Sequence, residues 1–251
     1  MKRISILNFK GGTGKTSLST NLAYALSTRG ARVLLVDCDL QANASSLLPT
    51  RDGGPTLTHV LKGQAIFTDA IREARPNLYI LPADSELNTA GNHILATGAR
   101  AYYILRNAIK NLHGYDFVIF DHSPSYGPVT ETALLASGEM LIPCELAPYA
   151  VQGLIAMIEK LTETLGGLDH EISMIGIVPF KLDQRYTMTG QYLASLKKRF
   201  GDFVVRPVRT DATVSRAQSV GKTVFEYDQH CKSAEDFAEL ALLLLPEGVK
   251  T

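Results

Sequence analysis

The stretch Lys10-Gly11-Gly12-Thr13-Gly14-Lys15-Thr16 decides the fold of this 251-residue chain. It follows an apolar, β-branched run from Arg3 to Leu7 and opens a helical pattern, Thr16 to Arg29, that Gly30 closes. The glycines let the backbone turn so that several N–H groups point into one anion-sized hollow, and the helix N-terminus adds its positive end. We therefore expect a phosphate-binding loop here, rather than a plain glycine-rich turn before a helix.

The loop departs from the strict P-loop pattern at one position, because Phe9 stands five residues before Gly14, where that pattern has glycine. Lys15 can reach the β and γ phosphates of a nucleotide, and the Thr16 hydroxyl is placed to ligate Mg²⁺. We expect Mg-ATP to be gripped by Lys10, Gly11, Gly12, Thr13, Gly14, Lys15, Thr16 and Ser17.

Short β-branched runs alternate with longer helical patterns along the rest of the chain, which favours a mainly parallel, twisted sheet flanked by helices on both faces. The runs at Val33–Val36 and Phe117–Phe120 are apolar at every position, as expected for strands buried on both sides, and an aspartate follows each. A final helix is predicted from Ser233, as N-cap, to Leu245. The predicted strands are Arg3–Leu7, Arg32–Val36, Leu78–Leu81, Phe117–Phe120, Met140–Pro143, Met174–Val178 and Phe203–Val205.

Composition favours an ordinary globular protein, with 45% hydrophobic and 20% charged residues, and the length favours a single domain over residues 1–251. Apolar runs are far shorter than the ~20 residues that cross a bilayer, and the N-terminus lacks the pattern of a signal peptide, so we expect a cytoplasmic location. Three widely spaced cysteines suggest neither a disulfide framework nor a zinc site. Because 25 basic residues match 25 acidic ones, any attraction to nucleic acid must come from local charge.

The glycine loop resembles the deviant Walker A motif, KGGxGK[ST], of the ParA/Soj/MinD group of P-loop ATPases. The mark of that group is an extra lysine before the glycines, here Lys10. The resemblance implies a deviant Walker A fold and an ATP-dependent homodimer in which Lys10 reaches across to the partner's ATP. A cation supplied in trans can be worth ~10³ to 10⁵ in rate in related phosphoryl-transfer systems.

Two further segments carry the resemblance. Asp37 to Asn43 looks like the first switch, usually DxDPQxN, with Leu40 in place of proline; it implies that Asp39 orients the attacking water near Mg²⁺ and that Asp37 supports the loop. Tyr115 to Asp121 resembles the Walker B strand, which implies that Asp121 holds Mg²⁺ through water. Because a carboxylate with a pKa near ~4 is a weak base at neutral pH, we expect Asp39 to position the water and turnover to be slow.

Asp121 is followed by His122-Ser123-Pro124 where the family usually has DxPP, so the second switch is less well matched, and we expect His122 to be a strand-end residue rather than a catalytic one. The stretch Val208 to Asp211 aligns with the loop that flanks adenine, which makes Asp211 the candidate for contact with the base.

Local charge favours DNA as a partner. Between Lys197 and Lys222 there are seven basic and two acidic residues, an excess that can attract phosphate backbones and that a dimer would present twice; a merely solvated charged face is the alternative. Arg216 stands where the family's SEAPSxGK segment has glutamate. The candidate DNA-binding residues are Lys197, Lys198, Arg206, Arg209, Arg216 and Lys222.

The resemblance leaves several activities open. A ParA-type switch that binds DNA non-specifically, segregates or positions a cargo and responds to a ParB-like or cargo-adaptor protein is favoured, in which case the protein would associate with the nucleoid. A MinD-like membrane ATPase is the alternative, although the C-terminal helix carries Glu235, Asp236 and Glu239 and makes a poor anchor. An operator-binding N-terminal module is not expected, because the chain begins at the first strand.

Enzymes on the same fold are the remaining alternatives. An iron–sulfur reductase of the nitrogenase iron-protein type needs cluster cysteines after the Walker B strand, and Asp121 to Val129 contains none. A small-molecule ligase or kinase stays open, and phosphate release without an acceptor would argue against it. The cargo cannot be read from the residues.

Overall fold

The centre of the fold is formed by strands that are buried on both faces. The run of β2 (Val33–Cys38) sends Val33 and Leu35 into one hydrophobic cluster and Leu34 and Val36 into another. Its neighbour β5 (Phe117–His122) alternates in the same way. The sheet therefore has a hydrophobic core on each side, as the unbroken apolar runs predict.

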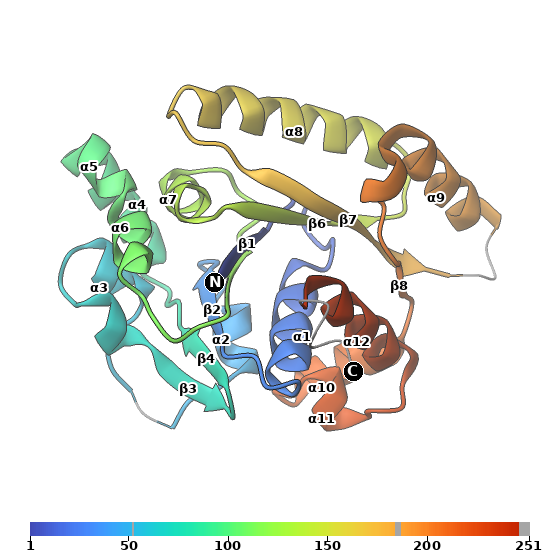
Figure 1. Ribbon diagram of the computed structural model, residues 1–251, viewed down its shortest axis with the longest axis horizontal. Helices are drawn as coiled ribbons and strands as arrows, with labels where there is room; N and C mark the ends of the chain where they lie inside the picture. The colour runs from blue at the N-terminus through green and yellow to red at the C-terminus, as the bar shows by residue number, and fades with distance from the viewer. Residues whose placement is uncertain (52, 184–186, 246–251) are drawn as a thin grey trace.

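These strands belong to an eight-stranded sheet in the computed structural model, which describes residues 1–51, 53–183 and 187–245 (Figure 1). The strand order is β3-β4-β2-β5-β1-β6-β7-β8, and every neighbouring pair is parallel except β3 with β4. The remaining strands are β1 (Lys2–Ile6), β3 (Arg72–Arg75), β4 (Leu78–Leu81), β6 (Glu139–Glu145), β7 (Ser173–Leu182) and β8 (Val208–Arg209).

Helices cover both faces of the sheet, which confirms the predicted architecture. One face carries α1 (Lys15–Ser27), α2 (Asn43–Leu47), α10 (Ala212–Ser219), α11 (Val224–Tyr227) and α12 (Lys232–Leu244). The other face carries α3 (Leu57–Leu61), α4 (Leu87–Thr97), α5 (Ala99–Tyr102), α6 (Ile104–Lys110), α7 (Pro128–Ala136), α8 (Ala150–Gly166) and α9 (Thr187–Phe200). Two 3₁₀ turns complete the elements, at Phe67–Ala70 and Gly201–Phe203.

Both ends of the sheet differ from the prediction. The antiparallel strand β3 has no counterpart among the predicted strands, because its residues, Arg-Glu-Ala-Arg, lack the apolar run of a buried strand. The strand predicted at Phe203–Val205 is wrong: a 3₁₀ turn ends at Phe203, and Val204 makes only an isolated bridge to Ile177. The edge strand β8 comes later in the chain, at Val208–Arg209.

The predicted cap of the last helix is also wrong. Helix α12 begins at Lys232, and its N-cap is Cys231, whose sulfur accepts a hydrogen bond from the Ala234 N–H. Ser233 lies inside the first turn and donates its hydroxyl to Asp211 instead. The three cysteines are buried and free, which agrees with the expectation that they form no disulfide. Within the described ranges, no helix is both long and apolar enough to cross a membrane.

Candidate nucleotide-binding site

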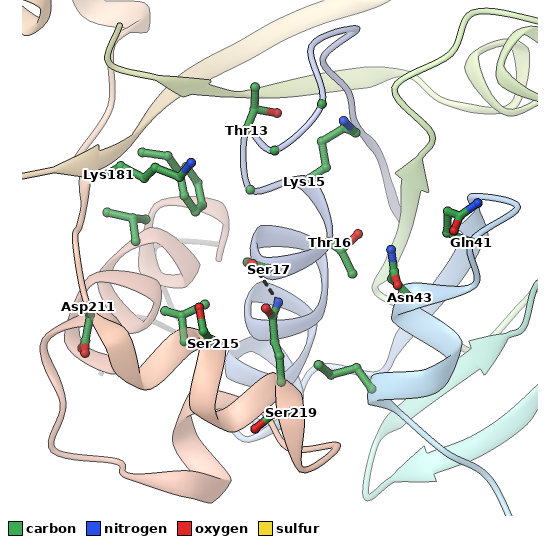
Figure 2. A pocket seen from close by; sticks show the side chains of 18 of the residues that line it. Thr13, Lys15, Thr16, Ser17, Gln41, Asn43, Lys181, Asp211, Ser215 and Ser219 are labelled. Atoms are coloured by element: carbon green, nitrogen blue, oxygen red, sulfur yellow. Dashed lines mark hydrogen bonds between the residues drawn. The ribbon is translucent and has the colours of Figure 1, made fainter.

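The carboxyl ends of the central strands border a cavity of about 1010 Å³. Its walls come from the glycine loop, the segment after β2, the end of β7 and helix α10 (Figure 2). Ligand pockets typically enclose roughly 300 to 1,000 Å³, and open parallel sheets bind their ligands beyond the carboxyl ends of the strands. Size and position therefore both suit a nucleotide.

The conformation of the glycine loop depends on Gly14, which a larger residue could not easily replace. Gly14 has a φ of 94°, in the left-handed region, and a Cβ atom added to it would lie 2.5 Å from the ring of Phe180. A side chain at this position would therefore strain the backbone and collide with β7. Phe180 is a neighbour of the loop that sequence reasoning missed, since it lies 166 positions away.

Helix α1 begins at the end of this loop with its N-terminus open. Gly14 is the N-cap and supplies no side-chain hydrogen bond, so the first N–H groups remain available to an anion. Lys15 is only 7% exposed, and its Nζ atom donates to the Lys10 carbonyl over 3.2 Å. Burial lowers the pKa of Lys15, whereas the nearby charges of Asp121 and Asp39 raise it. The structure thus brings the loop, Lys15 and both carboxylates together.

Asp37 has a structural task beside this loop. Its Oδ2 atom accepts hydrogen bonds from the Ser45 N–H and hydroxyl, at 2.8 and 2.7 Å, and its Oδ1 atom accepts one from the Asp39 N–H at 3.1 Å. The carboxylate therefore fixes the course of the segment after β2. Burial is the main cause that raises the pKa of Asp37, and these hydrogen bonds oppose it.

Asp39 lies at the cavity, and Asp121 is buried behind it, close enough for both charges to act on Lys15. Asp39 lines it, is 6% exposed, and accepts a hydrogen bond from the Gln41 N–H over 3.0 Å. Asp121 is fully buried beside Asp37 in the β2–β5 register, and its Oδ1 atom accepts a hydrogen bond from the Ser19 hydroxyl over 2.8 Å. Burial and the charge of Asp37 raise the pKa of Asp121. Two buried acidic side chains therefore meet at one point of the sheet edge.

This group of carboxylates fits a hydrated divalent cation. The Oδ2 atom of Asp121 is buried and has no hydrogen-bond partner in the described part of the chain, so one acceptor is left over for a bound water or metal. No cluster of three or more His, Cys, Asp or Glu ligands occurs among the described residues. A carboxylate oxygen of this kind suits Mg²⁺, which keeps several waters and takes further oxygens from substrate phosphates.

His122 is held as a neutral strand-end residue. It is fully buried, its Nε2 atom lies 2.8 Å from the Ser5 hydroxyl, and Ser5 in turn contacts the Ser137 hydroxyl at 2.6 Å. Burial, with the charge of Lys15, lowers the pKa of His122 to about 3. The ring therefore carries no charge near neutral pH, and its place at the end of β5 is the strand-end position that the sequence predicts.

Lys10 does not line the large cavity. That lining begins at Gly11, whereas Lys10 borders a separate cavity of about 530 Å³ together with Glu145 and Tyr149. The Nζ atom of Lys10 lies 2.8 Å from Glu145 Oε2, and Lys181 Nζ lies 2.8 Å from the other oxygen. These two lysines lower the pKa of Glu145. The Glu145 carboxylate thus holds the Lys10 side chain outside the large cavity of the same chain.

Asp211 lines the cavity, but its carboxylate is already engaged. It is the N-cap of α10 and accepts hydrogen bonds from the N–H of Thr213 at 2.9 Å and from the N–H and hydroxyl of Ser233 at 3.1 and 3.0 Å. These donors lower the pKa of Asp211 to about 2, against the effect of its burial. Its predicted contact with the base therefore needs an oxygen that also serves as a cap, and it stays a prediction.

The basic residues do not form one patch. Arg206 pairs with Glu239 at 2.5 Å, and Arg209 pairs with Glu235 at 2.6 Å and Asp236 at 2.8 Å. Helix α12 therefore neutralises both arginines. Of the other four, Lys197 and Lys198 lie in the last turn of α9, whereas Arg216 lies in the last turn of α10 and is followed by Lys222, and these two helices cover opposite faces of the sheet.

Sequence reasoning missed two further contacts. Glu145 restrains Lys10 from 135 residues away, and Gln218, on α10, donates a hydrogen bond to the Ser17 hydroxyl over 2.8 Å. Neither pairing has a local signal. The only available sign was that Gln218 stands where the SEAPSxGK segment has proline, which has no side-chain donor.

Known proteins match nearly the whole chain. A family model described as an AAA domain matches residues 1–174. The chromosome partitioning protein ParA of Caulobacter vibrioides is 32% identical over 248 residues, which span 96% of this chain and 92% of that protein. The sporulation initiation inhibitor protein Soj of Bacillus subtilis is 34% identical over 251 residues, 98% of this chain and 99% of the relative.

Solved structures agree in fold. An aspartate-to-alanine variant of Cyanothece McdA in complex with ATP is 25% identical, with a TM-score of 0.82 and 98% of each chain covered. The septum site-determining protein MinD of Pyrococcus horikoshii, complexed with Mg-ADP, is 25% identical, with a TM-score of 0.81 over 100% of this chain and 98% of that one. With its glycine loop, its paired carboxylates and these relatives, the chain belongs to the ParA/MinD family of P-loop ATPases.

Proposed function

We propose that the chain is an ATP-dependent homodimeric switch of the ParA type, which binds DNA without sequence preference and hydrolyses ATP to segregate or position a cargo. The observation that carries the proposal is the position of Lys10. Its side chain lies outside the large cavity of its own chain and is held there by one half-buried carboxylate, that of Glu145. A cation in this position is free to serve the nucleotide of a second copy.

Residues in and beside the cavity divide the chemistry among them. Lys15 and the N–H groups at the start of α1 would bind the phosphates, while Thr16 and Asp121 would hold a hydrated Mg²⁺, which would neutralise phosphate charge. Asp39, held by the Gln41 N–H, orients the attacking water next to this group. Because a carboxylate is a weak base, positioning rather than proton abstraction is its contribution, and hydrolysis is slow until a partner stimulates it.

The proposed DNA contacts rest on the exposed basic residues. Arg216 and Lys222 lie next to the nucleotide cavity on the α10 side, and Lys197 and Lys198 lie at the end of α9. The ion pairs of Arg206 and Arg209 with α12 leave these two with little net charge to offer. Arg216 and Lys222 are therefore the main candidates, and a dimer presents each of them twice.

A protein partner completes the proposal. Matched relatives are named chromosome partitioning proteins, so we propose a ParB-like or cargo-adaptor protein as the stimulator, a location on the nucleoid, and one ATPase domain over residues 1–251. The acidic residues Glu235, Asp236 and Glu239 of α12 argue against a membrane-binding helix of the MinD type.

Sedimentation of the Lys10→Ala variant tests the proposal. The parent should form dimers with ATP, and the variant should bind ATP but stay monomeric, because the lost contact is made in the other chain. Lys110→Ala, at an exposed position at the end of α6, is the matched control and should dimerise like the parent. Dimers of equal stability in the parent and the Lys10→Ala variant would refute the role of Lys10 in trans.

Two assays on the parent separate the alternatives. ATP-dependent sedimentation with anionic vesicles, but not with DNA, would favour a MinD-like protein. Phosphate release in the absence of any small-molecule acceptor supports a switch, whereas release that depends on an added acceptor would favour a ligase or kinase.

A further inference from the structure

Gln218 joins α10 to the phosphate-binding end of α1. Its Nε2 atom donates to the Ser17 hydroxyl oxygen over 2.8 Å, and the two residues are 201 positions apart in sequence. Both line the large cavity, and Figure 2 shows this bond as a dashed line at Ser17. Among the described residues it is the one side-chain hydrogen bond between the first two turns of α1 and α10.

The direction of this bond decides what Ser17 can do. An amide N–H is a donor, so the Ser17 oxygen acts as the acceptor, and the hydroxyl proton is left for another partner. No acceptor for that proton lies within hydrogen-bonding distance in the described part of the protein. The Ser17 O–H is therefore available to an acceptor inside the cavity.

The place of Ser17 indicates which acceptor this is. It is the third residue of α1, in the turn whose open N–H groups attract an anion, and it follows the two residues that serve the terminal phosphates and Mg²⁺. It also lies on the side of α1 that faces α10 (Figure 2). Because Lys15 and Thr16 serve the terminal phosphates and Mg²⁺, we infer that Ser17, on the α10 side, would meet the phosphate attached to the nucleoside.

We propose that Gln218 is a positioning residue for the nucleotide: it holds the Ser17 hydroxyl so that its proton points to the α-phosphate. In this role Gln218 acts through Ser17, to which it donates its hydrogen bond. The inference rests on the proposed ATP binding and deepens it. It gives α10, the helix that carries Arg216, a direct link to the proposed phosphate-binding end of α1.

Loss of the Gln218 hydrogen bond should weaken nucleotide binding but leave folding unchanged. A hydroxyl donor to a charged phosphate is worth more than a neutral hydrogen bond, but only while its proton is aimed at the acceptor. Loss of the Gln218 donor lets the hydroxyl rotate, so the affinity falls without loss of the helix. ATP and ADP both carry the α-phosphate, and the effect must be equal for the two.

A double-mutant cycle on the full chain tests the proposal by calorimetric titration with ATP and ADP. Gln218→Met keeps the length of the side chain and removes the donor, and it should weaken both nucleotides about three- to tenfold, the range of roughly one hydrogen bond. Ser17→Ala should weaken them at least as much. In the Ser17→Ala background, Gln218→Met should change the affinity less than about twofold, because the group through which it acts is gone.

Controls separate the possible failures. Gln229→Met, at an exposed loop position, should leave both affinities unchanged, and the melting temperature of the nucleotide-free Gln218→Met protein should match the parent's. Should Gln218→Met fail to fold, Gln218→Glu keeps a bond to Ser17 but reverses it, and must weaken both nucleotides. Additive losses in the cycle, parental affinity of either variant, or a loss confined to ATP would overturn the role of Gln218. A parent that binds no ATP would instead overturn the proposed function.

Discussion

Replacing Glu145 by glutamine should make the ATP-dependent dimer tighter. In the isolated chain, Glu145 binds Lys10 at 2.8 Å and Lys181 at 2.8 Å, and the proposed dimer needs Lys10 to leave this pair. The two lysines lower the pKa of Glu145, so the carboxylate is ionised at neutral pH, and the pair would be lost only in acid, as the pH falls through that lowered pKa. Glutamine keeps the shape and removes the charge.

The size of the effect follows from the exposure of the pair. The Lys10 side chain is 57% exposed, and an exposed ion pair is typically worth ~0.2 to 1 kcal/mol. A dimer breaks two such pairs, one in each chain, so about 0.4 to 2 kcal/mol is at stake. Because 1.4 kcal/mol corresponds to about a tenfold change in a dissociation constant, we expect a dimer about two- to thirtyfold tighter.

Analytical ultracentrifugation of both proteins with saturating Mg-ATP measures the dissociation constants. Glu163→Gln, which removes the same charge from an exposed position on α8, is the matched control and should behave like the parent. The difference should shrink in high salt, which screens the exposed pair in the parent. A Glu145→Gln dimer that is equal to or weaker than the parent's would show that the pair does not restrain Lys10.

Four further changes have definite expected outcomes. Lys15→Ala should abolish ATP binding, since it removes the buried charge at the phosphates, and equal affinity by titration would contradict this. Asp39→Ala should bind ATP but accumulate as a dimer with little phosphate release, and parental turnover would remove its catalytic role. Arg216→Glu should weaken ATP-dependent DNA binding for all sequences and flatten its salt dependence, as gel-shift series at several salt concentrations can show. Gly14→Ala should destabilise the loop, by roughly 1–3 kcal/mol for the positive φ alone, and lower both the melting temperature and ATP affinity, because its Cβ meets Phe180; an unchanged melting temperature would count against that reasoning.

The features that the sequence predicts well are those with a local cause. The run Val33–Val36 is apolar at every position because helices cover both faces of β2. The loop glycines likewise predict the turn that the backbone makes, because two of them adopt positive φ angles there. At the edges of the sheet, apolar runs predict the strands less well. The strand Arg72–Arg75 is half-buried, and its polar sequence does not predict a strand. The apolar segment Phe203–Val205 predicts a strand, but it lies beside the edge of the sheet as a 3₁₀ turn and the residues after it.

Long-range contacts set the remaining details of the site. Ser233 looks like a helix cap in sequence, but Asp211 takes its hydroxyl, so Cys231 caps the helix instead. The sequence predicts Arg209 as a free positive charge, but the fold places Glu235 of α12 beside it and the two form an ion pair. Such pairings depend on how helices pack across the chain, and no spacing rule along the sequence encodes them.

The placement of Lys10 outside its own cavity has a kinetic meaning. On the proposed function, one chain carries every group that its nucleotide needs except one, and this last group, Lys10 of the second copy, arrives with a collision. At concentrations where dimers are scarce, phosphate release should therefore rise with the square of the protein concentration. Any surface that gathers the chains would speed the reaction without touching the reacting atoms, so the rate of hydrolysis would report how densely the molecules are crowded.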